Sequence, residues 1–119
     1  MKKKVLISTG GSGGHVIPAI TIYDHLKSRY ETIISTDIRG LKYIDKEKYR
    51  SVIIDTPKLN NLFFYPFTFL KVFVLTIKCL ILLEKKKISI LISTGGYMSL
   101  PLCLAAKVLS IKIFLIEPN

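Results

Sequence analysis

The sequence predicts an α/β fold in which a doubly wound parallel sheet, of the Rossmann-like type, forms one domain. Short β-rich segments alternate with longer helical ones along the chain, which is typical of βαβ units. The segments with strand character are apolar throughout instead of alternating, as expected for strands that are covered on both faces. A chain of 119 residues with 50% hydrophobic and 22% charged residues fits one packed domain and excludes disorder.

Strands and helices are expected to follow one another in regular alternation. The expected strands share short apolar cores and lie at residues 4–8, 31–35, 51–55, 88–93 and 111–116. The expected helices are the longer segments between them, at residues 16–29, 41–49, 65–87 and 99–109. Right-handed crossovers should connect the successive parallel strands.

One hexapeptide occurs twice. Residues 6–11 read Leu-Ile-Ser-Thr-Gly-Gly, and residues 91–96 repeat the same six residues. In both places a helix with a proline near its start follows, Pro18 or Pro101. If the repeats end the first and fourth strands of a doubly wound sheet, these strands are neighbours where the strand order reverses. Both glycine turns then open into one crevice.

The first glycine loop has the composition of a diphosphate-binding turn. Glycines let the backbone approach an anion closely, and a helix N-terminus presents unpaired N–H groups with about half a positive charge. The loop residues that would serve this site are Gly10, Gly11, Ser12, Gly13 and Gly14. At the second loop Gly95 and Gly96 would do the same, and Ser99 would cap its helix or reach the same anion. The alternative interpretation is that both loops are ordinary tight turns.

The loop lacks two well-known nucleotide-binding patterns. No Gly-Lys-Ser/Thr follows it, so it is not a P-loop, and Val16 stands where the dinucleotide pattern G-x-G-x-x-G requires glycine. Asp37, after the second strand, would be the ribose ligand of a nicotinamide enzyme, which keeps that function open as a weak alternative. We favour the interpretation of Asp37 as a turn residue before Arg39 and Gly40.

His15 follows the last glycine of the first loop and is the candidate catalytic residue. In the first helical turn it would face the crevice, where an imidazole acts as a general base or donates to a phosphate or sugar oxygen. A capping or packing role is the alternative. His25 lies inside the helix without a glycine or acidic partner and carries no functional prediction.

The segment at residues 62–83 is apolar over a length that would cross a bilayer, with two lysines inside it. Because charges at the bilayer centre are costly, we expect a helix that does not span. Lys71, Lys78 and Lys85 are seven residues apart and form one basic stripe. Such a helix would lie in a membrane interface with its phenylalanines, Phe63, Phe64, Phe67 and Phe69, in the acyl boundary, or pack on the sheet with the lysines in solvent.

Charge and cysteine content limit the classes of partner and ligand that the protein could have. A net charge of +10 favours an anionic partner, and by itself does not choose among nucleic acid, anionic lipid and phosphate. Cys79 and Cys103 lie in apolar segments without metal-ligand spacing, so we expect reduced thiols, no metal and no cofactor. The apolar segment after Lys4 is too short for a signal peptide, which predicts a cytoplasmic protein.

Two long motifs in this order resemble the N-terminal domain of the MurG family. They are GGSGGHVIPAI, from Gly10, and GGYMSLPLCLAAKVLSIKIFLIEPN, from Gly95 to Asn119; the resemblance runs from Val5 to Asn119 without a large gap. It implies the N-terminal, acceptor half of a GT-B glycosyltransferase that moves N-acetylglucosamine from UDP-N-acetylglucosamine to lipid I, the undecaprenyl-diphosphate-linked muramyl pentapeptide. The family's proline-preceding GGTGGH is Gly10 to His15 here, with Ser12 in place of threonine.

The resemblance also implies roles for individual residues. The loops at Gly10 to Gly14 and Gly95 to Tyr97 would hold the lipid I diphosphate, and His15, Ser12 and Asn119 match acceptor-site positions. His15 would be the base of an inverting transfer. Residues 62–87 would match the membrane-docking patch, which predicts a peripheral protein on the cytoplasmic face of the inner membrane with an anionic lipid surface, and no nucleic acid, as partner. Leu100 replaces a glycine of the family motif.

The resemblance leaves the donor site unaccounted for. The family binds the UDP-sugar in a C-terminal domain, which residues 1–119 do not contain, so we expect an incomplete acceptor domain that is inactive alone. It would be a truncated chain or the acceptor and membrane subunit of a split lipid-linked-sugar transferase. A phosphate- or nucleotide-binding module without transferase activity is the second hypothesis, and a nicotinamide oxidoreductase the third.

Overall fold

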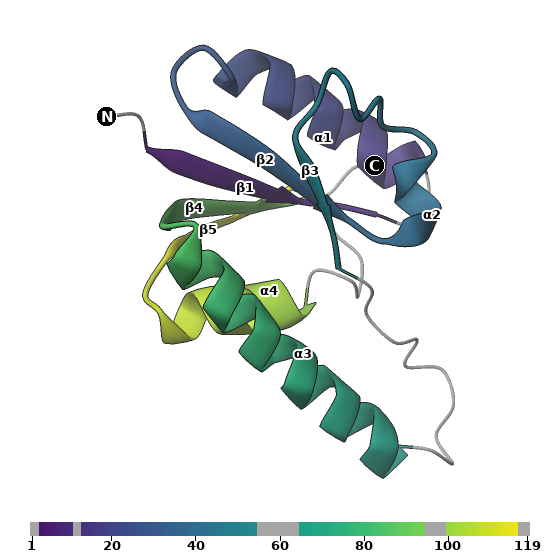
Figure 1. The fold of residues 1–119 in the computed structure, drawn as a ribbon, viewed down its shortest axis with the longest axis vertical. Coiled ribbons are helices and arrows are strands. Elements are labelled where there is room, and N and C mark those ends of the chain that lie inside the picture. Colours follow the sequence, from purple (N-terminus) through teal and green to yellow (C-terminus); the bar gives the residue numbers. More distant parts are fainter. Residues whose placement is uncertain (1–2, 11–12, 55–64, 95–99, 117–119) are drawn as a thin grey trace.

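The computed structural model shows a five-stranded, wholly parallel sheet with helices on both faces (Figure 1). It describes residues 3–10, 13–54, 65–94 and 100–116, and for side chains the third segment begins at residue 70. The strands are β1 (Lys4–Ser8), β2 (Glu31–Thr36), β3 (Ser51–Ile53), β4 (Ile88–Ser93) and β5 (Lys112–Leu115). The helices are α1 (Gly13–Leu26), α2 (Ile38–Leu41), α3 (Tyr65–Lys85) and α4 (Leu100–Val108). Sequence and structure agree on every strand and on three of the four helices, within a few residues at the ends.

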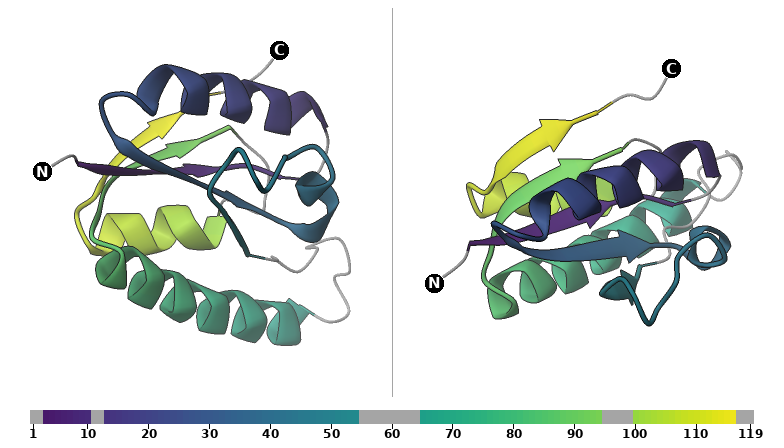
Figure 2. Two further views of the ribbon diagram at one scale, coloured as in Figure 1. Left: turned by 45° about the horizontal axis from the view of Figure 1, so that its top comes forward. Right: turned by 90° about the horizontal axis from the view of Figure 1, so that it is seen from above.

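The strand order is β3-β2-β1-β4-β5, so the order reverses between β1 and β4. The prediction that the first and fourth strands are neighbours is therefore confirmed, and so is the doubly wound topology. Helix α1 lies on one face of the sheet, whereas α3 and α4 lie on the other (Figure 2). All five strands run in one direction, which brings the carboxyl ends of β1 and β4 to the same edge.

Two hydrophobic clusters, one on each face, hold the layers together. Alternate residues of the central strand divide between them: Val5 and Ile7 join the α1 cluster, while Leu6 joins the α3 and α4 cluster. All three side chains are at most 1% exposed. This division explains why β1 is apolar at every position, as the sequence predicted.

The predicted helix at residues 41–49 is wrong in extent. The observed α2 ends at Leu41, and turns follow. The Asp45 carboxylate accepts a hydrogen bond from the Glu47 amide at 3.0 Å, which is a side-chain turn that competes with helix. Ile44 and Tyr49 are nevertheless buried in the α1 cluster, so the apolar residues of this segment serve the core without a helix.

The expectation that every strand is covered on both faces is wrong for β5. Phe114 is 45% exposed and Leu115 is 71% exposed, because β5 is at the end of the described sheet. The apolar pattern of a strand therefore did not distinguish a central strand from an edge strand. β3 also ends earlier than predicted, at Ile53.

Candidate functional site

The described parts of the two hexapeptides, residues 6–10 and 91–94, come together at the carboxyl edge of the sheet. Ser8 of β1 is in register with Ser93 of β4, and the Thr94 amide donates to the Ser8 carbonyl at 3.0 Å. The Thr94 hydroxyl donates to the Thr9 hydroxyl at 2.8 Å, and both threonines are at most 1% exposed. A buried hydroxyl pair thus joins the two strand ends just before each glycine loop begins.

Gly10 occupies a position that a larger residue would not tolerate. Its φ of +153° lies in the range that L side chains rarely adopt. A Cβ there would lie 2.8 Å from the Asp37 Oδ1 atom and 3.1 Å from the Asp37 backbone nitrogen. Gly40 of α2 faces it, since a Cβ on Gly40 would lie 3.0 Å from the Gly10 Cα and would collide with the Thr36 hydroxyl. Two glycines therefore allow α2 to pack directly on the first loop.

His15 connects the start of α1 to the end of β4. It lies in the first turn of α1, half-buried, and its Nδ1 atom is 3.1 Å from the Thr94 carbonyl oxygen. Because a carbonyl oxygen only accepts hydrogen bonds, this contact places the proton of a neutral imidazole on Nδ1. The Nε2 lone pair then remains available to take up a proton. The predicted position in the first turn is confirmed, and this contact adds a structural function to any chemical one.

Gly13 and Gly14 form the first residues of α1, three residues earlier than the helix predicted from the sequence. The backbone of the loop thus enters the helix N-terminus directly, as an anion site requires. Tyr43 lies against this turn, because a Cβ on Gly13 would be 3.3 Å from its Cε1 atom. The other predicted loop residues lie outside the described residues: Gly11, Ser12, Gly95, Gly96, Tyr97, Ser99 and Asn119.

Asp37 is an N-cap residue, as the favoured interpretation predicted. Its Oδ1 atom accepts from the Gly40 amide at 2.8 Å, and its Oδ2 atom is 3.5 Å from Arg39 Nη2. The carboxylate is largely buried, and one of its oxygens already serves as the cap of α2. A ribose-binding role, on which the nicotinamide alternative depended, receives no support from this arrangement.

Sequence reasoning missed four residues that shape the site: Thr9, Thr94, Gly40 and Tyr43. The two threonines were visible in the repeat, but only its glycines were used for prediction. Pairing of the repeats in a parallel sheet would have placed these hydroxyls together. Gly40 and Tyr43 carried no such signal, because their contacts with the first loop depend on how α2 folds back.

Helix α3 presents an exposed apolar face bordered by lysines. Leu70, Phe73, Val74, Ile77 and Ile81 are between 41% and 62% exposed. At about 100° per residue these five side chains span roughly a third of the helix circumference. Lys71 and Lys78 are exposed along one border of this face, and Lys85 continues that border. The lysines lie in solvent, as one of the two interpretations expected, and the exposed face of α3 is in addition largely apolar.

The remaining membrane-facing candidates are only partly described. Phe63 and Phe64 lie outside the described residues, and Phe67 lies in the first turn of α3 without a described side chain. Among the helices of the described residues, none combines the length and the hydropathy that crossing a bilayer requires.

The thiols lie in the cluster between the sheet and helices α3 and α4. Burial raises the pKa of Cys79 to about 11, and it also raises the pKa of Cys103. Both cysteines are free, as the sequence predicted. Neither thiol belongs to the loop site.

Comparison with known proteins identifies the family. Residues 5–119 match the glycosyltransferase family 28 N-terminal domain. A Pelagibacter ubique protein named UDP-N-acetylglucosamine--N-acetylmuramyl-(pentapeptide) pyrophosphoryl-undecaprenol N-acetylglucosamine transferase is 50% identical over 100% of this chain and 34% of its own length. A Wolbachia protein from Brugia malayi with the same name is 37% identical over 97% of this chain and 32% of its own length.

The solved structures agree with this fold. MurG of Acinetobacter baumannii superposes with a TM-score of 0.81 at 23% identity, over 98% of this chain and 36% of that one. The chain thus spans about a third of the length of the proteins it matches. The predicted GT-B type of α/β fold and the predicted family are confirmed, and the chain belongs to glycosyltransferase family 28 through its N-terminal domain.

Proposed function

We propose that residues 1–119 form the acceptor-binding part of a glycosyltransferase that moves N-acetylglucosamine from UDP-N-acetylglucosamine to lipid I. The observation that carries the proposal is the contact of His15 Nδ1 with the Thr94 carbonyl at 3.1 Å, which fixes the imidazole at the start of α1 against the end of β4. The names of the 50% and 37% identical relatives supply the substrates. The donor sugar would bind to the remaining two thirds of the enzyme, in the same chain or in a partner.

The chemistry assigns the base to His15. In an inverting transfer the acceptor C4 hydroxyl attacks the anomeric carbon of the donor sugar, UDP leaves, and the hydroxyl proton must be removed. With Nδ1 donating to Thr94, Nε2 is the atom that accepts this proton. The partner carbonyl also stabilises the imidazolium that forms, because Nδ1–H then carries part of the positive charge.

The diphosphate of the acceptor would lie at the N-terminus of α1. Gly13 and Gly14 supply backbone N–H groups there, and the helix is 14 residues long, so its dipole contributes to anion binding. Hydrogen bonds to a charged group contribute about 1.5 to 3 kcal/mol each. Several such bonds would bind a diphosphate without a lysine or arginine in the loop. The loop residues Gly11, Ser12, Gly95, Gly96, Tyr97 and Ser99, together with Asn119, remain proposed contacts.

Helix α3 would dock the protein on the membrane that carries the acceptor. Its exposed apolar face, including Phe73 and Ile81, would enter the acyl boundary, while Lys71 and Lys78 contact lipid phosphates. The protein would then be peripheral, on the cytoplasmic face of the inner membrane. The phenylalanines before residue 70 would extend the same surface.

A substitution at His15 tests the proposed base. In a complete enzyme, made by joining this chain to the C-terminal part of the Pelagibacter relative, His15→Gln should lower kcat for N-acetylglucosamine transfer by about 10²- to 10⁴-fold. His25→Gln is the matched control, because His25 is exposed on the same helix and contacts only the Thr21 carbonyl within the described residues. Full turnover by His15→Gln would eliminate the base assignment.

Diphosphate binding at the N-terminus of α1 and membrane binding by α3 need separate measurements on the 119-residue chain. Gly14→Val places a branched side chain at the exposed start of α1 and should weaken binding of a short-chain polyprenyl diphosphate at least tenfold. Phe73→Ser with Ile77→Ser should lower partitioning into anionic vesicles, whereas Leu104→Ser, an exposed site on α4, should not. If Gly14→Val left diphosphate binding unchanged, the diphosphate site would not lie at the N-terminus of α1.

A further inference from the structure

A basic pocket lies at the opposite edge of the sheet from the proposed acceptor site. It is an open cavity of about 380 Å³, and its polar lining consists of Lys46, Tyr49, Arg50, Ser51 and Lys86. Arg50 directly precedes β3, and Lys86 lies in the turn between α3 and β4. These positions are at the amino ends of the strands, whereas both glycine loops follow carboxyl ends. The pocket is therefore separate from the crevice described above.

The pocket gathers positive charge without compensation. Lys46 and Arg50 come from the connection between α2 and β3, and Lys86 comes from the turn after α3; no carboxylate lines the cavity within the described residues. The ion pairs found in the described part of the chain involve Lys4, Lys27 and Arg39 instead. Like charges held around one cavity repel one another, and a bound anion would relieve that repulsion.

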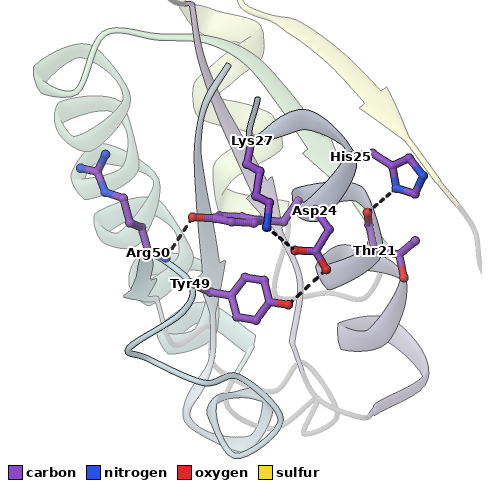
Figure 3. A network of polar contacts seen from close by, with 7 residues as sticks. Thr21, Asp24, His25, Lys27, Tyr49 and Arg50 are labelled. Atoms are coloured by element: carbon purple, nitrogen blue, oxygen red, sulfur yellow. Dashed lines mark hydrogen bonds and ion pairs between the residues drawn. The ribbon is translucent and has the colours of Figure 1, made fainter. Parts of the chain in front are cut away.

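Arg50 is held in place by its backbone. Its amide donates to the Tyr23 hydroxyl at 3.3 Å, and its carbonyl accepts from the Ile34 amide at 2.8 Å. Tyr23 is itself fixed by an edge-to-face contact with Tyr49, whose hydroxyl donates to Asp24 at 3.2 Å. Figure 3 shows the Arg50 guanidinium directed away from this polar network. The network positions Arg50 and leaves its side chain available to the cavity.

We propose that this pocket binds a phosphate-bearing anion. The Arg50 guanidinium offers a planar pair of donors that matches two phosphate oxygens, and Lys46 and Lys86 supply point charges beside it. The Ser51 hydroxyl adds a neutral donor at the cavity wall. Such a phosphate is carried either by a lipid headgroup or by a soluble compound. Neither is required by the proposed transferase chemistry, so the inference stands independently of that function.

The test uses the 119-residue chain with two probes. Inorganic pyrophosphate represents the soluble source, and its binding is followed by amide shifts in ¹⁵N NMR spectra. We expect saturable shifts at Ser51 and Lys86, weakened about tenfold or more by Arg50→Gln, because each charged hydrogen bond contributes about 1.5 to 3 kcal/mol. Reading the shifts at these residues separates the pocket from any pyrophosphate bound at the α1 N-terminus.

Vesicles of phosphatidylglycerol with phosphatidylcholine represent the lipid source. Lys107→Gln is the matched control, since it removes one exposed positive charge on α4, away from the pocket. Pocket binding of a headgroup predicts a larger loss of vesicle partitioning for Arg50→Gln than for Lys107→Gln. A response to pyrophosphate identifies a soluble ligand, and a response to vesicles alone identifies a headgroup. The proposal is refuted if Arg50→Gln and Lys86→Gln both behave like Lys107→Gln towards both probes, while circular dichroism shows all three folded.

Discussion

Replacing Gly10 with alanine adds only one methyl group but should destabilise the domain strongly. The φ of +153° alone costs an L residue about 1 to 3 kcal/mol. The new Cβ would also lie 2.8 Å from Asp37 Oδ1, so the carboxylate must move away from the Gly40 amide that it caps at 2.8 Å. Loss of an N-cap costs about 0.5 to 2 kcal/mol. Together these terms predict that the free energy of unfolding falls by about 1.5 to 5 kcal/mol.

Urea denaturation followed by far-ultraviolet circular dichroism measures this change. With a slope of about 2 kcal/mol per molar urea, the midpoint should fall by roughly 0.8 to 2.5 M. Gly14→Ala is the control, because Gly14 is exposed inside α1 and alanine is the better helix former there. The control should leave the midpoint unchanged or raise it slightly. A loss below 0.5 kcal/mol in Gly10→Ala, on the order of the change at ordinary surface sites, would refute the reasoning from the close approach of Asp37.

Three further predictions concern buried residues, one at the site and two in the cluster under α3 and α4. Thr94→Val removes the 2.8 Å hydrogen bond to Thr9 and leaves that hydroxyl without this donor, so urea denaturation should show a loss of about 1 to 3 kcal/mol; a loss as small as that of an exposed threonine would contradict the pairing. Leu83→Ala truncates a side chain that is 0% exposed in the cluster under α3 and α4, and the free energy of unfolding should fall by about 2 to 5 kcal/mol. Leu104→Ala, at a half-exposed position, should lower it by less than about 1 kcal/mol. Because the pKa of Cys79 is raised from 9.0 to about 11 in the folded state, the unfolded chain loses its thiol proton first, and stability should be unaffected by this group below pH 9 and fall as pH rises towards 11. Cys79→Ala should abolish that part of the alkaline loss, and an identical slope in both proteins would contradict the assignment.

Much of the architecture could be predicted from local patterns. The uninterrupted apolar character of residues 5–7 required a strand buried on both faces, and β1 is the central strand between β2 and β4. The repeated hexapeptide predicted that β1 and β4 are neighbours, which follows from the single switch point of a doubly wound sheet. The prediction of a helix at residues 41–49 failed for two reasons. Asp37 caps a helix that begins earlier, at Ile38, and the Asp45 side chain accepts from the Glu47 amide, a local hydrogen bond that competes with helix formation.

For the catalytic candidate, too, local pattern predicted the position of the residue but not its contacts. The sequence indicated His15 through its place after the glycines, but not which of its nitrogens would be available, because that depends on a carbonyl 79 residues away along the chain. The apolar and basic character of α3 was visible as a pattern. Whether the lysines covered the whole solvent face required knowledge of which residues α4 and the sheet bury.

The order of the elements, the neighbouring positions of β1 and β4 and the family followed from local patterns in the sequence. These features depend on local composition and on chain connectivity, which short-range patterns record. Tertiary contacts were needed to show that Gly40 packs on Gly10 and that Lys86 joins Lys46 and Arg50 around one cavity. Such contacts form between segments that are distant in the chain, where the path of the backbone, rather than residue type, sets which atoms meet.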